Sequence, residues 1–117
     1  MQRRDWTLRV HDILEAIARI QRYVAGLSFE EFARDEKTLD AVVRNLEVIG
    51  EAARHIPNEL EALNPDVPWT YMRGMRNVLA HEYFGVDASI LWHTAQNDLP
   101  PLVQPLQSML GESGPQR

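Results

Sequence analysis

The chain has 117 residues, of which 44% are hydrophobic and 25% are charged. These values fit one soluble domain with a core large enough to fold alone, and they exclude disorder as the default interpretation. The absence of cysteine excludes disulfides and thiolate zinc sites. A formal net charge of −5 argues against a general nucleic-acid coat, although arginines gathered on one face still act over a Debye length of about 8 Å.

The start of the chain carries no sign of export. Met1 to Trp6 lack the apolar stretch of a signal peptide, and no apolar run reaches the length that crosses a membrane. We therefore expect a cytoplasmic protein with no membrane partner.

The first predicted element is a long amphipathic helix. Between Asp5 and Leu27 apolar residues recur at spacings of three and four, which predicts about six helical turns, with Gly26 near the end. Ser28 and Glu31 then have the spacing of a capping box, in which each side chain bonds the backbone of the other. A short second helix should open there.

The strongest helical pattern runs from Lys37 to about Ile56 and contains two apolar stripes. The larger stripe consists of Leu39, Val42, Val43, Leu46, Ile49, Ala53 and Ile56. The smaller consists of Ala41, Val48 and Ala52, with Gly50 nearby. Two stripes predict contacts on two sides. The helix is either central in a bundle, or its small-residue side takes part in a subunit contact.

Prolines and glycines divide the rest of the chain. Pro57, Pro65 and Pro68 predict a loop of roughly ten residues. A helix should follow from Trp69 to about Phe84, and Gly85 should end it.

The last predicted helix begins after Asp87, which has the character of an N-cap. Pro100-Pro101 should kink or break it, since each proline removes a backbone donor. No strand-like alternation occurs. The expectation is an all-α bundle of four to five helices over residues 1–110, followed by a frayed tail, 111–117.

The helix from Trp69 has two unlike faces when it is wound at about 100° per residue. An ordinary core stripe spans roughly 120° and consists of Met72, Met75, Val78 and Leu79. Polar residues fall within roughly 140° on the other side: Arg73, Arg76, Asn77 and His81, with Tyr83 close in angle to Arg76. This face has no carboxylate. It is an arrangement for holding an anion and moving a proton, so phosphate chemistry is the natural candidate.

In a nuclease, His81 would be the general acid/base and Arg76 would hold the scissile phosphate. Arg73 and Asn77 would contact substrate. No metal-ligand pattern and no cofactor motif is present, so the fitting reaction is a metal-independent transesterification through the RNA 2′-hydroxyl. The alternative for this set is a solvated helix face whose histidine caps the helix.

Arg76 and His81 lie about 140° apart on a straight helix, so one helix would not aim both at one phosphate. Either the helix end tightens near His81, or two copies of the helix meet across a dimer axis and share the site. We favour the dimer. The other histidines, His11, His55 and His93, are weaker candidates, and the three tryptophans are interpreted as core or interface residues.

Three segments in this order resemble a known family: Val43 to Ala53, Trp69 with Met72 to Met75, and Arg76 to Tyr83. The last resembles the signature Arg, four residues, His, one residue, Tyr of HepT-like toxins in the HEPN superfamily. The resemblance covers about Asp5 to Leu106, and Pro100-Pro101 departs from the usual last helix.

The resemblance implies an all-α HEPN homodimer with ribonuclease activity, in which Arg76 and His81 are catalytic. It also implies a type VII-like toxin–antitoxin pair, with a MntA-like nucleotidyltransferase antitoxin that transfers AMP from ATP to the motif tyrosine, here Tyr83. Two other interpretations stay open at this point. One is a non-catalytic HEPN dimer that binds a nucleotide or a nucleotidyltransferase. The other is a plain structural dimer.

Overall fold

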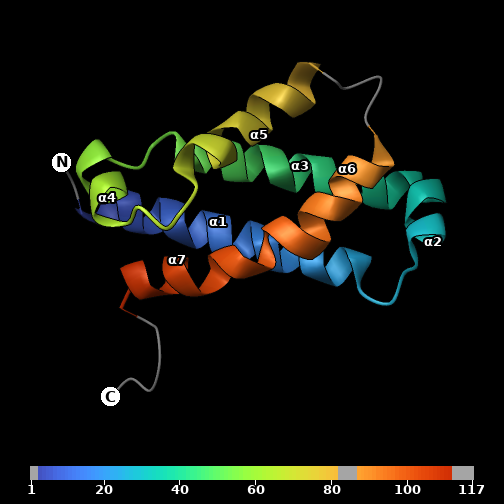
Figure 1. The fold of residues 1–117 in the computed structure, drawn as a ribbon, viewed down its shortest axis with the longest axis horizontal. Coiled ribbons are helices and arrows are strands. Elements are labelled where there is room, and N and C mark those ends of the chain that lie inside the picture. The colour runs from blue at the N-terminus through green and yellow to red at the C-terminus, as the bar shows by residue number, and fades with distance from the viewer. Residues whose placement is uncertain (1–2, 82–86, 112–117) are drawn as a thin grey trace.

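Every regular element is a helix within the part of the chain that the computed structural model describes: the backbone of residues 3–81 and 87–111, and the side chains of 5–76 and 87–111. The predicted all-α architecture is thereby confirmed. The α-helices are α1 (Arg3–Val24), α2 (Phe29–Arg34), α3 (Glu36–Ala53), α4 (Asn58–Leu63), α5 (Trp69–His81), α6 (Ala88–His93) and α7 (Val103–Met109) (Figure 1).

The helix α3 is the centre of the molecule. It runs antiparallel to α1 on one side and packs against α5 on another, so it lies between them (Figure 1). The predicted apolar stripes form this core: Val10, Ile13, Ile17 and Ile20 of α1 and Val42, Leu46 and Ile49 of α3 are buried. On the small-residue side of α3, Gly50 contacts α5, while Val48 and Ala52 line a hollow. The structure therefore shows α3 as the central helix, and a subunit contact on its small-residue side stays a prediction.

Side-chain caps begin three of the helices. The capping box before α2 is confirmed, with the Glu31 amide donating to Ser28 Oγ and the Ser28 amide donating to Glu31 Oε1, at 3.1 and 2.9 Å. Asp87 caps α6 as predicted, accepting from the Ser89 amide. The cap of α3 is Asp35, which accepts from the Thr38 amide and hydroxyl. This explains why α3 begins slightly before the expected Lys37.

The predicted loop after α3 is partly wrong, because it contains the short helix α4. Pro57 stands at its N-cap position with an extended backbone, and the amides of Leu60 and Glu61 donate to the Pro57 carbonyl. None of the α4 residues is buried, so the apolar periodicity that reveals longer helices is absent. Trp69 is a core residue as predicted, and its indole N–H donates to the Asn64 carbonyl.

The last predicted helix is divided as expected at Pro100-Pro101, where a 3₁₀ turn covers Pro100–Leu102. A π-helical turn, Thr94–Asp98, precedes it and was not predicted. The two changes redirect the chain, so that α6 packs against α2 and α3 while α7 packs against α1 (Figure 1). Among the described residues, no helix has the length and apolar character needed to cross a bilayer. Gly85 and the predicted tail beyond Gly111 lie outside the described residues.

Candidate active site on α5

The helix α5 presents its predicted core stripe to the bundle. Met72 and Met75 are buried, while Arg76 is exposed. The helix therefore has the two unlike faces that the sequence indicated, as far as Arg76. Val78 and Leu79 lie beyond the side chains that the structure describes.

The backbones of α5 and α3 come very close at Arg76 and Gly50. A Cβ atom placed on Gly50 would stand 2.7 Å from both the amide nitrogen and the Cβ of Arg76, closer than real side chains come. Only a glycine lets the two backbones touch here. The backbone and Cβ atom of Arg76 therefore lie directly against Gly50 of α3, the neighbour of Glu51 in the sequence.

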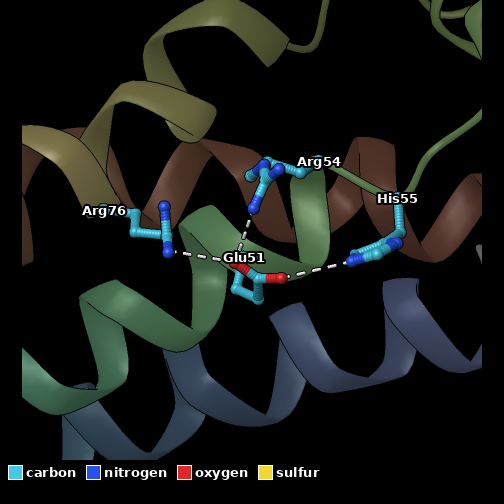
Figure 2. A network of polar contacts seen from close by, with 4 residues as sticks. All are labelled: Glu51, Arg54, His55 and Arg76. Carbon is cyan, nitrogen blue, oxygen red and sulfur yellow. Dashed lines mark hydrogen bonds and ion pairs between the residues drawn. The ribbon is translucent and has the colours of Figure 1, made fainter.

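Glu51 is the centre of a polar network around Arg76 (Figure 2). Its Oε1 lies 3.0 Å from Arg76 Nε in an ion pair and accepts a hydrogen bond from Arg54 Nη1 at 3.1 Å. Its Oε2 lies 3.2 Å from His55 Nε2. The hydrogen bond with His55 is the main cause of a lowered pKa of the Glu51 carboxyl, and Arg54 and Arg76 lower that pKa further. Glu51 is therefore an anion at neutral pH.

Arg73 is held by a different part of the molecule. Its Nη1 pairs with Glu61 of α4, and its Nη2 donates to Thr70 Oγ1 at 3.2 Å. Its side chain is 33% exposed and that of Glu61 is 19% exposed, so the pair is partly shielded from water. The two arginines that the sequence placed on one face are thus directed to separate carboxylates.

The remaining predicted site residues are described only in part. The backbone of Asn77 and His81 belongs to α5, but their side chains lie outside the described residues, and Tyr83 lies outside them altogether. The predicted meeting of Asn77 with His81 and the 140° separation of Arg76 from His81 therefore stay predictions.

A hollow of about 430 Å³ opens beside Arg76 between α1, α3 and α5. Its charged lining is balanced, with three guanidinium groups and three carboxylates, and small apolar side chains complete it. The lining residues are Arg9, Arg44, Arg76, Asp12, Glu47, Glu51, Val48 and Ala52. Within residues 3–81 and 87–111, no three His, Asp or Glu side chains are grouped as metal ligands would be.

Comparison with known proteins places this chain in a family. The family model described as "Ribonuclease HepT-like" matches residues 13–109. The chain belongs to the HepT-like family. A protein of Thermococcus cleftensis named "Probable ribonuclease HepT" is 47% identical over 93 residues, which cover 80% of this chain and 84% of that protein. No solved structure matches.

Two further relatives of this HepT-like chain are named "Putative RNase". One, from Caldanaerobacter subterraneus subsp. tengcongensis, is 41% identical over 100 residues, covering 86% of this chain and 88% of the relative. The other, from Methanocaldococcus jannaschii, is 38% identical over 102 residues, covering 87% and 94%. The family, and the helical fold that the resemblance implied, are thereby confirmed.

Sequence reasoning did not foresee that Glu51 would form an ion pair with Arg76. The neighbour of Glu51 in the sequence, Gly50, was the available signal, since a glycine inside a strongly periodic helix often marks a close backbone approach. His55, taken as a weaker candidate, also belongs to this network.

Proposed function

We propose that this HepT-like chain is a metal-independent endoribonuclease that acts in the cytoplasm as the toxin of a HepT/MntA-type pair. The observation that carries the proposal is the placement of Arg76. Its side chain is 45% exposed and lines the charged hollow, while the contact with Gly50 fixes the position of its Cβ atom. A half-exposed, oriented guanidinium is suited to a phosphate group.

In this reaction the RNA 2′-hydroxyl attacks the adjacent phosphorus. His81 accepts the proton of that hydroxyl as general base, and a protonated histidine donates a proton to the departing 5′-oxygen. The products are a 2′,3′-cyclic phosphate and a 5′-hydroxyl, and no water is consumed. Arg76 binds the non-bridging oxygens and stabilises the charge that builds on them in the transition state. Asn77 positions His81 or the phosphate.

Arg73 is proposed as a secondary substrate contact. Two of its nitrogens are used by Glu61 and Thr70, so a phosphate would be bound through the donors that remain.

The active form is proposed to be a homodimer. The angular separation of Arg76 and His81 favours a site shared by two α5 helices. A second observation supports a partner chain at the surface formed by α5 and α6. An apolar hollow of about 210 Å³ lies between α5 and α6, and Ile90 beside it is 59% exposed. A second copy would cover this surface.

The oligomeric state is tested by sedimentation at micromolar concentration. The wild-type chain should sediment as a dimer, and Ile90→Glu should shift it toward the monomer. Leu63→Glu is the matched control, because Leu63 is 75% exposed on α4, away from that hollow. A monomeric wild-type chain contradicts the shared site.

The partner is proposed to be a MntA-like nucleotidyltransferase that transfers AMP from ATP to Tyr83. The transfer joins the tyrosine oxygen to the α-phosphorus and releases pyrophosphate. The added phosphodiester brings negative charge to the anion site, where it competes with RNA for Arg76.

The cleavage test compares wild type, His81→Ala and Arg76→Ala on single-stranded RNA, with and without EDTA. Loss of a general acid/base should lower the rate about 10²–10⁴-fold. EDTA should leave the wild-type rate unchanged. His93→Ala is the control, since His93 is an exposed histidine on α6 paired with Asp98. Cleavage that EDTA abolishes and His81→Ala spares would refute the assignment. A wild-type chain that binds RNA but does not cut it would favour the non-catalytic binding dimer.

A further inference from the structure

Among the described residues, Glu51 contacts two arginines and one histidine, and one of these contacts joins two helices. Arg54 and His55 follow Glu51 at spacings of three and four, at and just beyond the C-terminal end of α3, where such pairs form locally (Figure 2). Arg76 comes from α5. The contact with Arg76 therefore does more than stabilise one helix, because it fixes the side chain of one helix relative to another.

The atoms used in this contact leave the phosphate-binding end of Arg76 available. The ion pair is made through Nε, at the base of the guanidinium. The Arg76 side chain is 45% exposed, so a phosphate group can reach it from solvent. A guanidinium held at its base presents its outer donors in a fixed plane, which is the arrangement that binds two oxygens of one phosphate.

Gly50 and Glu51 act on the same residue from consecutive positions. The missing side chain of Gly50 brings the Arg76 backbone onto α3, and the carboxylate of Glu51 then meets the head group. The Cβ atom and the guanidinium group of Arg76 are therefore both constrained. Each of the three pairs is about half exposed, and exposed ion pairs contribute little to folding stability. Stability alone is therefore a weak explanation for this arrangement.

We propose that Glu51 is a positioning residue, which orients the Arg76 guanidinium toward the RNA phosphate. The inference rests on the proposed function, because it assumes that Arg76 binds the scissile phosphate. Glu51 itself does not touch the reacting atoms. Its effect should appear in kcat more than in KM, since misplacing a transition-state contact by about 1 Å can cost up to about 10²-fold in rate.

The test measures kcat and KM for cleavage of a single-stranded RNA oligonucleotide by two variants of Glu51. Glu51→Ala removes the acceptor and should lower kcat about 10–10²-fold with a smaller change in KM. Glu51→Gln keeps an oxygen facing Arg76 Nε and should retain an intermediate rate. The control is Asp40→Asn, which removes an exposed carboxylate from the same helix, outside the lining of the hollow. It should keep the wild-type kcat.

A double-mutant cycle separates positioning from a general effect on the fold. In an Arg76→Ala background, Glu51→Ala should produce no further loss, because its only route to the substrate is gone. Circular dichroism and urea unfolding should show that each variant is folded. If Glu51→Ala unfolds, Glu51→Gln replaces it in both measurements. It should lower kcat in the wild-type background and should have no effect in the Arg76→Ala background.

Three results would overturn the inference. Equal kcat values for Glu51→Ala and the Asp40→Asn control would show that Glu51 does not position Arg76. A Glu51→Ala variant that cleaves faster than wild type would make Glu51 a competitor of the phosphate. Additive losses of kcat for Glu51→Ala and Arg76→Ala in the cycle would show that Glu51 acts independently of Arg76. An Arg76→Ala variant with wild-type cleavage is a different failure, because it removes the proposed function as well.

Discussion

Gly50 and Arg76 touch through their backbones, in a contact so close that the Arg76 amide nitrogen would lie 2.7 Å from any Cβ on Gly50. Helices with larger side chains at the crossing stay further apart. The contact therefore sets both the spacing of α3 and α5 and the position from which the Arg76 guanidinium extends.

Gly50→Ala should destabilise the chain, because the new methyl group collides with the backbone of Arg76 rather than with a flexible side-chain end. Overpacking of this kind costs about 1–3 kcal/mol. Gly74→Ala is the matched control within α5, since nothing lies within 4 Å of a Cβ placed there. That change should raise stability by about 0.5–1 kcal/mol through helix propensity. Urea unfolding measures both, and a neutral Gly50→Ala would contradict the close approach.

Arg73→Ala should lower stability more than it lowers cleavage. It leaves Glu61, a half-buried carboxylate, without its cation, so a double-mutant cycle with Glu61→Ala should give a coupling of about 1 kcal/mol in unfolding. Cleavage should fall less than in Arg76→Ala, because two nitrogens of Arg73 are already used within the chain. The opposite outcome, full loss of cleavage with unchanged unfolding, would make Arg73 a primary phosphate ligand.

Acid should weaken the fold in part through Asp35. Hydrogen bonds from the Thr38 hydroxyl and amide lower the pKa of this carboxyl below its ordinary 3.8. A carboxyl with a lower pKa in the folded state adds stability above its unfolded pKa, and this contribution is lost as the pH falls through the folded pKa. Asp35→Asn keeps an N-cap acceptor but does not titrate, so its loss of unfolding free energy between about pH 7 and pH 3 should be smaller than that of wild type.

The control for this comparison is Asp40→Asn on the same helix, whose carboxylate has no recorded hydrogen bond within the described residues. It should lose as much stability in acid as the wild type does. An Asp35→Asn variant that behaves identically to Asp40→Asn would show that the cap does not contribute to acid sensitivity.

Tyr83→Phe should resist neutralisation by the proposed nucleotidyltransferase while it keeps RNA cleavage, since only one hydroxyl is removed. Wild-type chain incubated with that enzyme and ATP should gain AMP and lose cleavage. Intact-mass analysis with peptide mapping identifies the residue that is modified. Tyr23→Phe, which alters an exposed tyrosine at the end of α1, should be modified as the wild type is. Equal AMP incorporation into Tyr83→Phe would refute the assignment.

Long helices were predictable because their burial is periodic. The stripes of α1 and α3 recur at three and four, and most of their residues are buried, so the sequence pattern directly reflects the packing. Local signals also succeeded: Ser28 and Asp87 cap helices through their own following residues. The helix α4 and the π turn at Thr94 escaped detection, since neither has a buried stripe long enough to be periodic.

The site was predictable only within one helix. The exposure of Arg76 follows from helical spacing, but its pairing with Glu51 joins residues 25 positions apart (76 − 51) and depends on how α5 packs on α3. The same is true of Arg73 and Glu61, which belong to different helices. The spacing of residues in the sequence predicts which side chains share one face of a helix. It does not predict which carboxylates of a neighbouring helix will pair with them, and such pairs change what the face can bind.

The balanced lining of the hollow has a kinetic consequence. Arg9, Arg44 and Arg76 are matched by three carboxylates, and the whole chain carries a formal charge of −5. A single chain therefore has no long-range field that draws in polyanions, and RNA should arrive at the unassisted diffusional rate, about 10⁵–10⁶ M⁻¹s⁻¹ for a neutral encounter. The association rate would then be similar for all transcripts. Discrimination among them would depend on the rate at which each bound RNA dissociates.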